Sequence, residues 1–191
     1  MVSNRALEKI RAGQPAFGLA MAMNDSVVAE LFARSGVDWI WIDDQHGTFD
    51  RDSVLRAIQV IAPHGVTPIV RVASNEFFRI GRALDAGALG VIVPMVNSAE
   101  EARQAVFAAR YPPRGGRSSG GVRLAFMGPD YAQQANDNIL VAVMIETRQA
   151  VERTAEIAGV EGVDCIMLGP GDLAVSLGVE RGSDEHEAAI M

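Results

Sequence analysis

Six short apolar runs recur along the chain, and each has the length of a single β-strand. They are rich in Val and Ile and nearly continuous, which is typical of strands covered on both faces of a parallel sheet. We expect strands at residues 16–22, 37–43, 68–72, 89–95, 139–146 and 163–169.

Amphipathic helical patterns separate these runs. Asp25 or Ser26 would cap a helix that runs to about Arg34, and Ser98 and Glu101 match a capping box at the start of another helix. Apolar stripes predict further helices at about 54–61, 77–84 and 147–158. Alternating strands and helices indicate right-handed βαβ units and an α/β fold.

The junction after the first run distinguishes two α/β folds. A dinucleotide-binding sheet would carry G-x-G-x-x-G there, whereas residues 20–27 (AMAMNDSV) contain no glycine. We therefore predict a (β/α)8 TIM barrel. Residues 110–131 are rich in Pro, Gly, Ser and Arg and are predicted to form a long functional or mobile loop, with room for a short seventh strand near Arg117.

The length of the chain is short for this fold. A (β/α)8 barrel typically needs about 250 residues, and the chain has 191. We find no candidate for an eighth strand, so we expect one barrel domain over 1–191 that lacks its last strand–helix unit. The favoured explanation is a portion of a longer chain. The alternatives are a truncated barrel closed by a partner subunit, or an inactive one that folds poorly alone.

Composition narrows the functional classes. The net charge of −7 argues against nucleic-acid binding as the main role. No apolar run reaches the ~18–20 residues that cross a bilayer, and the N-terminal segment lacks the apolar region of a secretory signal. The single cysteine, Cys165, fits a reducing, cytoplasmic setting, and its mid-strand position predicts a core residue and not a nucleophile.

Polar side chains follow several of the predicted strands. Asp43 and His46 follow the second run, Arg71 ends the third, Glu146 ends the fifth, and Asp172 follows the sixth. In a barrel these positions meet at one face, where barrel enzymes hold their active sites. Each residue alone is weak evidence, because an acid at a strand end is more often a helix N-cap.

Each of these residues also has a structural alternative. Asp172 could cap the following helix, and Arg71 would point either into the barrel mouth or into a buried ion pair. His46, with acids within three residues, would suit a general base near neutral pH. The other two histidines, His64 and His186, lie in a Pro-Gly loop and a charged tail, and we expect both at the surface.

Paired carboxylates without a nearby Cys or His suit a hard divalent ion such as Mg²⁺. Such an ion would polarise the keto group of a 2-oxo acid, and the backbone N–H groups of Gly171 and Asp172 would bind its carboxylate. A Schiff-base mechanism is improbable, because the only lysine is Lys9 in the predicted N-terminal helix.

An ordered set of motifs resembles the HpcH/HpaI aldolase family from about residue 18 to residue 178. The segments that carry the resemblance are GLAMAMNDSVVAELFARSGVDWIWIDDQHG, PIVRV, ALDAGALGVIVPMVNSAEEA, ARYPPRGGRS, VMIETRQAVE and GVDCIMLGPGDLAVSLG. The resemblance implies a (β/α)8 barrel that commonly forms hexamers. It also implies a divalent metal (Mg²⁺, Mn²⁺ or Co²⁺) and reversible cleavage of 4-hydroxy-2-oxo acids to pyruvate and an aldehyde, as in the catabolism of aromatic compounds.

The resemblance also implies roles for individual residues. It makes His46 the catalytic base, Asp85 the acid that raises the basicity of His46, and Arg71 the group that stabilises the transition state and the enolate. It makes Glu146 and Asp172 the metal ligands.

The resemblance further implies that the backbone of Gly171 and Asp172 holds the pyruvate carboxylate. Two positions depart from the best-known pattern: Gln45 stands where a Glu is common, and Met144 stands where a substrate-binding Gln is frequent.

Two other readings remain open at this stage. A citrate-lyase-β-like enzyme would use the same enolate chemistry on acyl-CoA substrates, with the arginines of residues 110–123 binding the pyrophosphate. Those arginines could equally fold the loop or bridge subunits. A non-catalytic truncated barrel is the third possibility.

Overall fold

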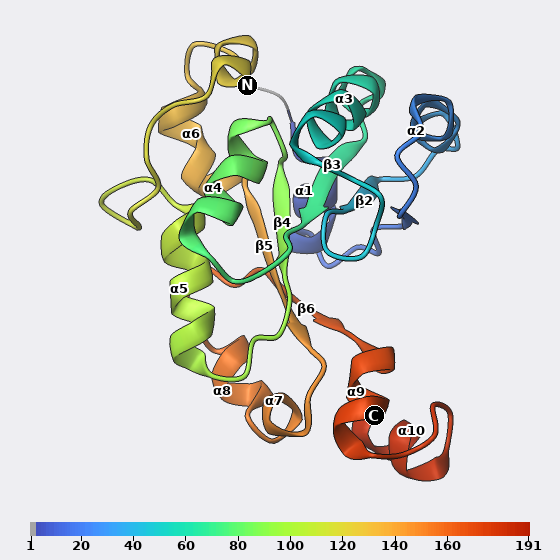
Figure 1. The fold of residues 1–191 in the computed structure, drawn as a ribbon. Coiled ribbons are helices and arrows are strands. Elements are labelled where there is room, and N and C mark those ends of the chain that lie inside the picture. The colour runs from blue at the N-terminus through green and yellow to red at the C-terminus, as the bar shows by residue number, and fades with distance from the viewer. Residues whose placement is uncertain (1–2) are drawn as a thin grey trace.

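The fold is a curled, six-stranded parallel sheet, a half-barrel with helices packed on its outer side, as a computed structural model of the chain shows (Figure 1). The structure describes residues 3–191. The strand order follows the chain order from β1 to β6. The strands are β1 (Gly18–Met21), β2 (Trp39–Asp43), β3 (Thr67–Arg71), β4 (Gly90–Val93), β5 (Leu140–Ile145) and β6 (Cys165–Leu168).

All six strands expected from the apolar runs are confirmed, and helices connect them. The α-helices are α1 (Arg5–Arg11), α2 (Ser26–Ala33), α3 (Arg51–Ile61), α4 (Phe77–Asp85), α5 (Ala99–Ala109), α6 (Tyr131–Asn138), α7 (Arg148–Glu152), α8 (Thr154–Ala158), α9 (Pro170–Leu177) and α10 (Asp184–Ile190). Short 3₁₀ helices lie at Ala62–His64 and Val122–Phe126.

Local capping explains where several helices begin. The Asp25 carboxylate accepts hydrogen bonds from two backbone N–H groups of the first turn of α2, as expected from the sequence. The Ser98 hydroxyl accepts from the N–H of Glu101, but the Glu101 carboxylate binds the N–H of Asn97 instead of that of Ser98, so the expected capping box is only half formed. The helix expected over 147–158 is divided at Arg153 into α7 and α8.

The two faces of the sheet carry different cores. Ile40 and Ile42 point outward into the large cluster between the strands and the helices. Trp39 and Trp41 alternate with them and point to the inner face, where a second, smaller apolar cluster includes Leu7 of α1. The apolar runs are therefore continuous because both faces of the sheet are packed.

Helix α1 covers the amino-terminal end of the half-barrel. The amide of Asn4 donates to the carbonyls of Leu89 and Asn138, both at 2.7 Å. At the same end, the ammonium of Lys9 lies 2.8 Å from the carboxylate of Asp38. The only lysine is thus held in an ion pair at the amino end of the sheet, opposite to the carboxyl ends of the strands.

The arginine-rich segment folds through interactions within the chain. Arg110 is buried and binds the carbonyls of Ile139 and Gly162, at 2.6 and 3.1 Å, and the carboxylate of Asp164, at 3.2 Å. Arg117 is also buried and lies over the ring of Tyr111 at 4.6 Å.

The expected seventh strand near Arg117 is wrong. This part of the described chain holds the 3₁₀ helix and then α6, because the buried arginines satisfy backbone carbonyls and aromatic faces in place of a ladder of strand hydrogen bonds.

Two further expectations on single residues need correction. His186 is buried, with 1% of its surface exposed, because α10 folds back onto α9 instead of forming a free charged tail. Cys165 is half-buried on the inner face of the sheet, and burial, with the charge of Asp164 adding to it, raises the pKa of its thiol to about 11. His64 is exposed, as expected. Within residues 3–191, no helix is long and apolar enough to span a bilayer.

Candidate active site at the strand carboxyl ends

The polar residues predicted from the strand ends gather at one edge of the sheet. Asp43 ends β2 and Arg71 ends β3, and the register pairs these two residues directly. Glu146 follows β5 and Gly169 follows β6, and the last residues of those two strands are also paired. Parallel strands with aligned ends therefore bring together side chains that are more than a hundred residues apart in sequence.

Arg71 forms a two-point ion pair with Asp43. Its Nε donates to Oδ1 at 2.9 Å and its Nη2 to Oδ2 at 2.5 Å, and both side chains are about nine-tenths buried. The guanidinium lies 4.5 Å from the ring centroid of Trp41, and its Nη1 lies 3.9 Å from the sulfur of Met144. The buried ion pair expected as one alternative for Arg71 is thus confirmed, and the side chain lies against Trp41 and Met144 on the inner face of the half-barrel.

Asp43 also organises the turn that carries His46. Its Oδ1 accepts from the backbone N–H groups of Gln45 and His46, both at 3.2 Å. Burial by itself would raise the pKa of Asp43, but the hydrogen bond from Arg71 and that from the His46 N–H outweigh it and hold the pKa below its usual value. His46 is exposed at the rim, so its imidazole is open to a ligand.

Glu146 is the buried acid of the site, with 1% of its surface exposed. Its Oε1 accepts from the backbone N–H of Met95 at 2.7 Å, and Met95 takes the left-handed conformation with φ of 57°. Burial raises the pKa of Glu146, and the nearby charge of Asp172 raises it further, although the Met95 N–H and Arg71 lower it. Glu146 is therefore a partly desolvated carboxylate that lies within the electrostatic influence of a second one, Asp172.

Gly169 is required where it stands. A Cβ built at this residue would lie 2.4 Å from Oε2 and 2.6 Å from Cβ of Glu146, well inside contact distance. The absence of a side chain lets the end of β6 approach the glutamate. This close approach also brings the first turn of α9, which carries Asp172, toward Glu146.

Asp172 lies in the first turn of α9 and is not its N-cap, so the capping alternative is wrong. The cap is Gly169, Pro170 occupies the first helical turn, and no side chain caps the first N–H groups. Helix N-termini of this kind bind anions. Asp172 is exposed, and its carboxylate is free to act as a ligand beside Glu146.

Asp85 lies apart from the other predicted site residues. It is the last residue of α4, and because a crossover helix runs back along the sheet, its end lies near the amino ends of the strands. Its carboxylate binds Arg117 at 3.0 Å. Within one chain, the structure therefore brings Asp85 to Arg117 and not to His46, and its role beside the histidine stays a prediction.

Three residues important to this geometry were missed in the sequence. Asp43 was noted at a strand end but given no role. An acid and an arginine that end consecutive strands were a usable signal, because such ends pair in a parallel sheet. Met95 contributes only its backbone N–H, which no pattern of side chains reveals. Gly169 is required by a tertiary contact with Glu146, so the only local signal for it is its place in the G-P-G-D turn.

The donor set suits a hard divalent cation held by few protein ligands. Among residues 3–191, no group of three His, Cys, Asp or Glu side chains is placed to hold a metal. Glu146 and Asp172 supply two carboxylates, and Mg²⁺ is commonly bound by one or two, with water and substrate oxygens completing its shell. A cavity of about 320 Å³ is lined in part by Ser74, Asn75 and Met95, and it is linked to the site through Met95, whose backbone N–H binds Glu146; neither carboxylate lines it.

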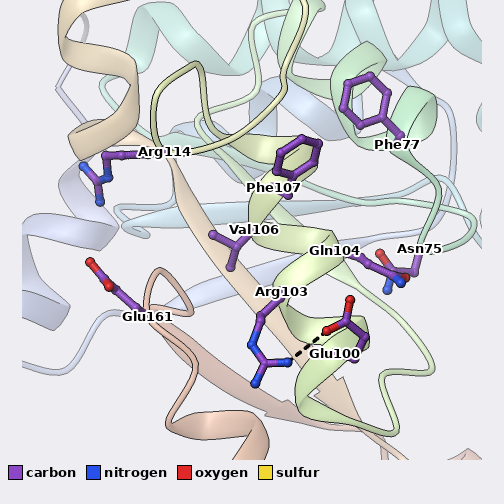
Figure 2. A pocket seen from close by; sticks show the side chains of 9 residues that line it. All are labelled: Asn75, Phe77, Glu100, Arg103, Gln104, Val106, Phe107, Arg114 and Glu161. Atoms are coloured by element: carbon purple, nitrogen blue, oxygen red, sulfur yellow. Dashed lines mark hydrogen bonds and ion pairs between the residues drawn. The ribbon is translucent and has the colours of Figure 1, made fainter.

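A larger cavity lies elsewhere in the described chain. It is a groove of about 650 Å³ on the helix layer, where Phe77 of α4 and Phe107 of α5 approach each other and Arg103 pairs with Glu100 (Figure 2). Its lining holds none of the strand-end residues described above. We therefore assign the candidate active site from the converging charged groups and not from cavity size.

Comparison with known proteins gives consistent matches over most of the chain. The family model described as HpcH/HpaI aldolase/citrate lyase matches residues 17–190. A protein of Escherichia coli named 4-hydroxy-2-oxo-heptane-1,7-dioate aldolase is 42% identical over 188 residues, which cover 95% of this chain and 71% of that protein.

Two solved structures support the same match. A HpcH/HpaI aldolase/citrate lyase family protein from Burkholderia cenocepacia superposes with a TM-score of 0.92 and 34% identity, over 98% of this chain and 78% of that one. A HpcH/HpaI aldolase from Desulfitobacterium hafniense gives a TM-score of 0.88 and 30% identity, over 95% and 73%.

Proposed function

The chain belongs to the HpcH/HpaI aldolase/citrate lyase family, and from that premise we propose that its strand-end site cleaves and forms 4-hydroxy-2-oxo acids through a pyruvate enolate, with a divalent metal. Its homologues are named as aldolases, which are carbon–carbon lyases. We further propose that the six-stranded half-barrel corresponds to part of a (β/α)8 barrel.

One observation carries this proposal: two carboxylates and an arginine face the same rim of the half-barrel. Arg71 ends β3 and Glu146 follows β5, and the close approach of Gly169 to Glu146 brings the first turn of α9, which carries Asp172, to the same edge. Glu146 and Asp172 would hold the metal, which would act as a Lewis acid toward the keto group of the substrate. The pyruvate-release assay described below would compare different metals and different aldehydes.

The residues of this chain supply the remaining chemistry. Arg71 keeps its fork on Asp43, which leaves N–H donors for the developing enolate oxygen. The uncapped N–H groups at the start of α9, including that of Gly171, would bind the substrate carboxylate. His46, exposed at the end of β2, would take the proton of the 4-hydroxyl group as the C3–C4 bond breaks and its electron pair forms the enolate.

The structure gives no support to the acyl-CoA alternative. The pyrophosphate of CoA would need free cations, whereas Arg110, Arg114 and Arg117 are engaged in ion pairs within the chain, and Arg123 lies over the ring of Phe126 at 5.9 Å. We propose instead that these arginines fold the 110–131 segment. For partners, we propose pyruvate, an aldehyde and further copies of the same chain.

The direct test is release of pyruvate from a 4-hydroxy-2-oxo acid with Mg²⁺ or Mn²⁺, coupled to a dehydrogenase. We expect EDTA to abolish the rate and His46→Ala to lower it by about 10²–10⁴-fold, the usual contribution of a general base. His64→Ala is the matched control, because His64 is exposed and precedes β3, at the end of the strand opposite to Arg71. A rate unaffected by EDTA would exclude the metal mechanism, and full activity of the His46 variant would exclude the assigned base.

A further inference from the structure

His186 is a buried histidine that the proposed mechanism does not use. It lies in α10, and Figure 1 shows α10 beside α9 at the carboxyl-terminal side of the sheet. The N–H of Gly182 donates to its Nδ1 at 3.1 Å, and its Nε2 lies 2.8 Å from the carbonyl oxygen of Pro170. Because Nδ1 accepts, Nε2 carries the proton, and this pair of bonds assigns a neutral imidazole that donates to Pro170.

The bond to Pro170 acts on the peptide group that joins Pro170 to Gly171. A trans peptide is planar, and its C=O and N–H point in opposite directions. Whatever fixes the direction of the Pro170 carbonyl therefore fixes the direction of the Gly171 N–H. That N–H is one of the uncapped donors at the start of α9.

The two ends of α9 are held in different ways, and the start depends on the hydrogen bond from His186 to Pro170. The end of the helix is tied to Arg148, whose N–H donates to the Ser176 hydroxyl and whose Nη2 donates to the Leu177 carbonyl. The start has a glycine cap without a side chain, and a Cβ at Gly171 would meet no atom within 4 Å, so no neighbouring atom packs closely against the side-chain position of Gly171.

From this geometry we infer that His186 is a positioning residue for the substrate carboxylate: it holds the Pro170 carbonyl and so aims the Gly171 N–H. This inference rests on the proposed function, in which the start of α9 binds the carboxylate of a 2-oxo acid. It assigns no contact between His186 and the substrate.

The test compares two polar substitutions that each keep one of the two hydrogen bonds. In His186→Gln, the amide nitrogen reaches the place of Nε2 and keeps the bond to Pro170. In His186→Asn, the shorter amide keeps the bond to Gly182 and loses the one to Pro170. Exposed His64→Asn is the control for the substitution itself. Pyruvate binding with Mg²⁺ is measured by calorimetry, and KM and kcat by the coupled assay, with thermal unfolding on every variant.

We expect His186→Asn to weaken pyruvate binding and raise KM by about threefold to tenfold, as the loss of one hydrogen bond allows, with kcat little changed. His186→Gln should restore most of the affinity even where its thermal stability matches that of the Asn variant. Wild-type affinity in a folded His186→Asn protein, or equal weakening in both variants, would overturn the inference.

Two further outcomes are informative. A wild-type protein that neither binds pyruvate nor releases it would overturn the proposed function together with this inference, which separates that failure from the preceding one. If the Asn variant does not fold, the ¹⁵N shifts of the imidazole in the wild-type protein decide: a proton on Nε2 alone supports the inference, and one on Nδ1 overturns it.

Discussion

The contact between Gly169 and Glu146 leads to a sharp prediction for Gly169→Ala. The added methyl group would lie 2.4 Å from Oε2 and 2.6 Å from Cβ of Glu146, whereas carbon atoms in contact lie about 3.5–4.0 Å apart. Rotation of the carboxylate alone cannot relieve an overlap with the stem of the side chain. Either β6 or the whole glutamate must therefore move by about 1 Å.

The size of the effect follows from what that movement breaks. Overpacking of a buried position costs about 1–3 kcal/mol, and movement of Glu146 would also weaken its hydrogen bond from Met95, a bond to a charged group that is worth about 1.5–3 kcal/mol. For a chain of this size, each kcal/mol shifts Tm by about 2–4 °C. We expect the overpacking by itself to lower Tm by about 2–12 °C, with any weakening of the Met95 hydrogen bond adding to this, and metal affinity to fall by about 10–100-fold.

The measurement is thermal unfolding together with Mn²⁺ binding followed by calorimetry. Gly81→Ala is the matched control, because Gly81 lies within α4 and a Cβ there meets no atom within 4 Å. That control should keep the metal affinity and gain about 0.5–1 kcal/mol, because alanine favours a helix over glycine. Unchanged Tm and unchanged Mn²⁺ affinity in Gly169→Ala would refute the reasoning from close approach.

Two more predictions concern ion pairs. Arg71→Met leaves Asp43 buried without its partner, so urea unfolding should show a loss of about 3–5 kcal/mol; the double variant with Asp43→Asn should lose less than the sum of the single changes, and strict additivity would argue against the coupling. Asp38 has a pKa held below its usual value by the hydrogen bond from Lys9, against the effect of burial and with help from the Phe17 N–H. Because the depressed pKa belongs to the folded state, the stabilisation is present above the unfolded-state value of about 3.9 and is lost as the pH falls below it. Asp38→Asn should therefore be less stable than wild type at pH 7, and the gap should narrow below about pH 4; a constant gap would contradict the assignment.

The family membership of the chain and the roles of its site residues rest on different observations. The match over residues 17–190 and the identity to the Escherichia coli aldolase establish the family. The roles of His46, Arg71, Glu146 and Asp172 are proposals that rest on the geometry of the rim. The assays with EDTA and with His46→Ala address them directly.

The sequence by itself determined the six strands, the parallel α/β class and the strand-end residues. Apolar runs of strand length and capping residues such as Asp25 act locally, so their consequences can be read from neighbouring positions. The same holds for the ends of strands, where Arg71 and Glu146 were expected to face a common edge. The six predicted strands follow in chain order in the sheet, as expected for successive βαβ units.

Only the tertiary structure decided which polar groups meet. The fork of Arg71 on Asp43, the contact of Gly169 with Glu146, and the separation of Asp85 from His46 depend on register and on the direction of helices. His186 shows the same limit. Its charged surroundings in the sequence predict an exposed residue, and only the structure shows that α10 packs on α9 and buries it. Local patterns set which face of an element is apolar, but the partners of a buried polar group are distant in sequence and are fixed only when the strands align.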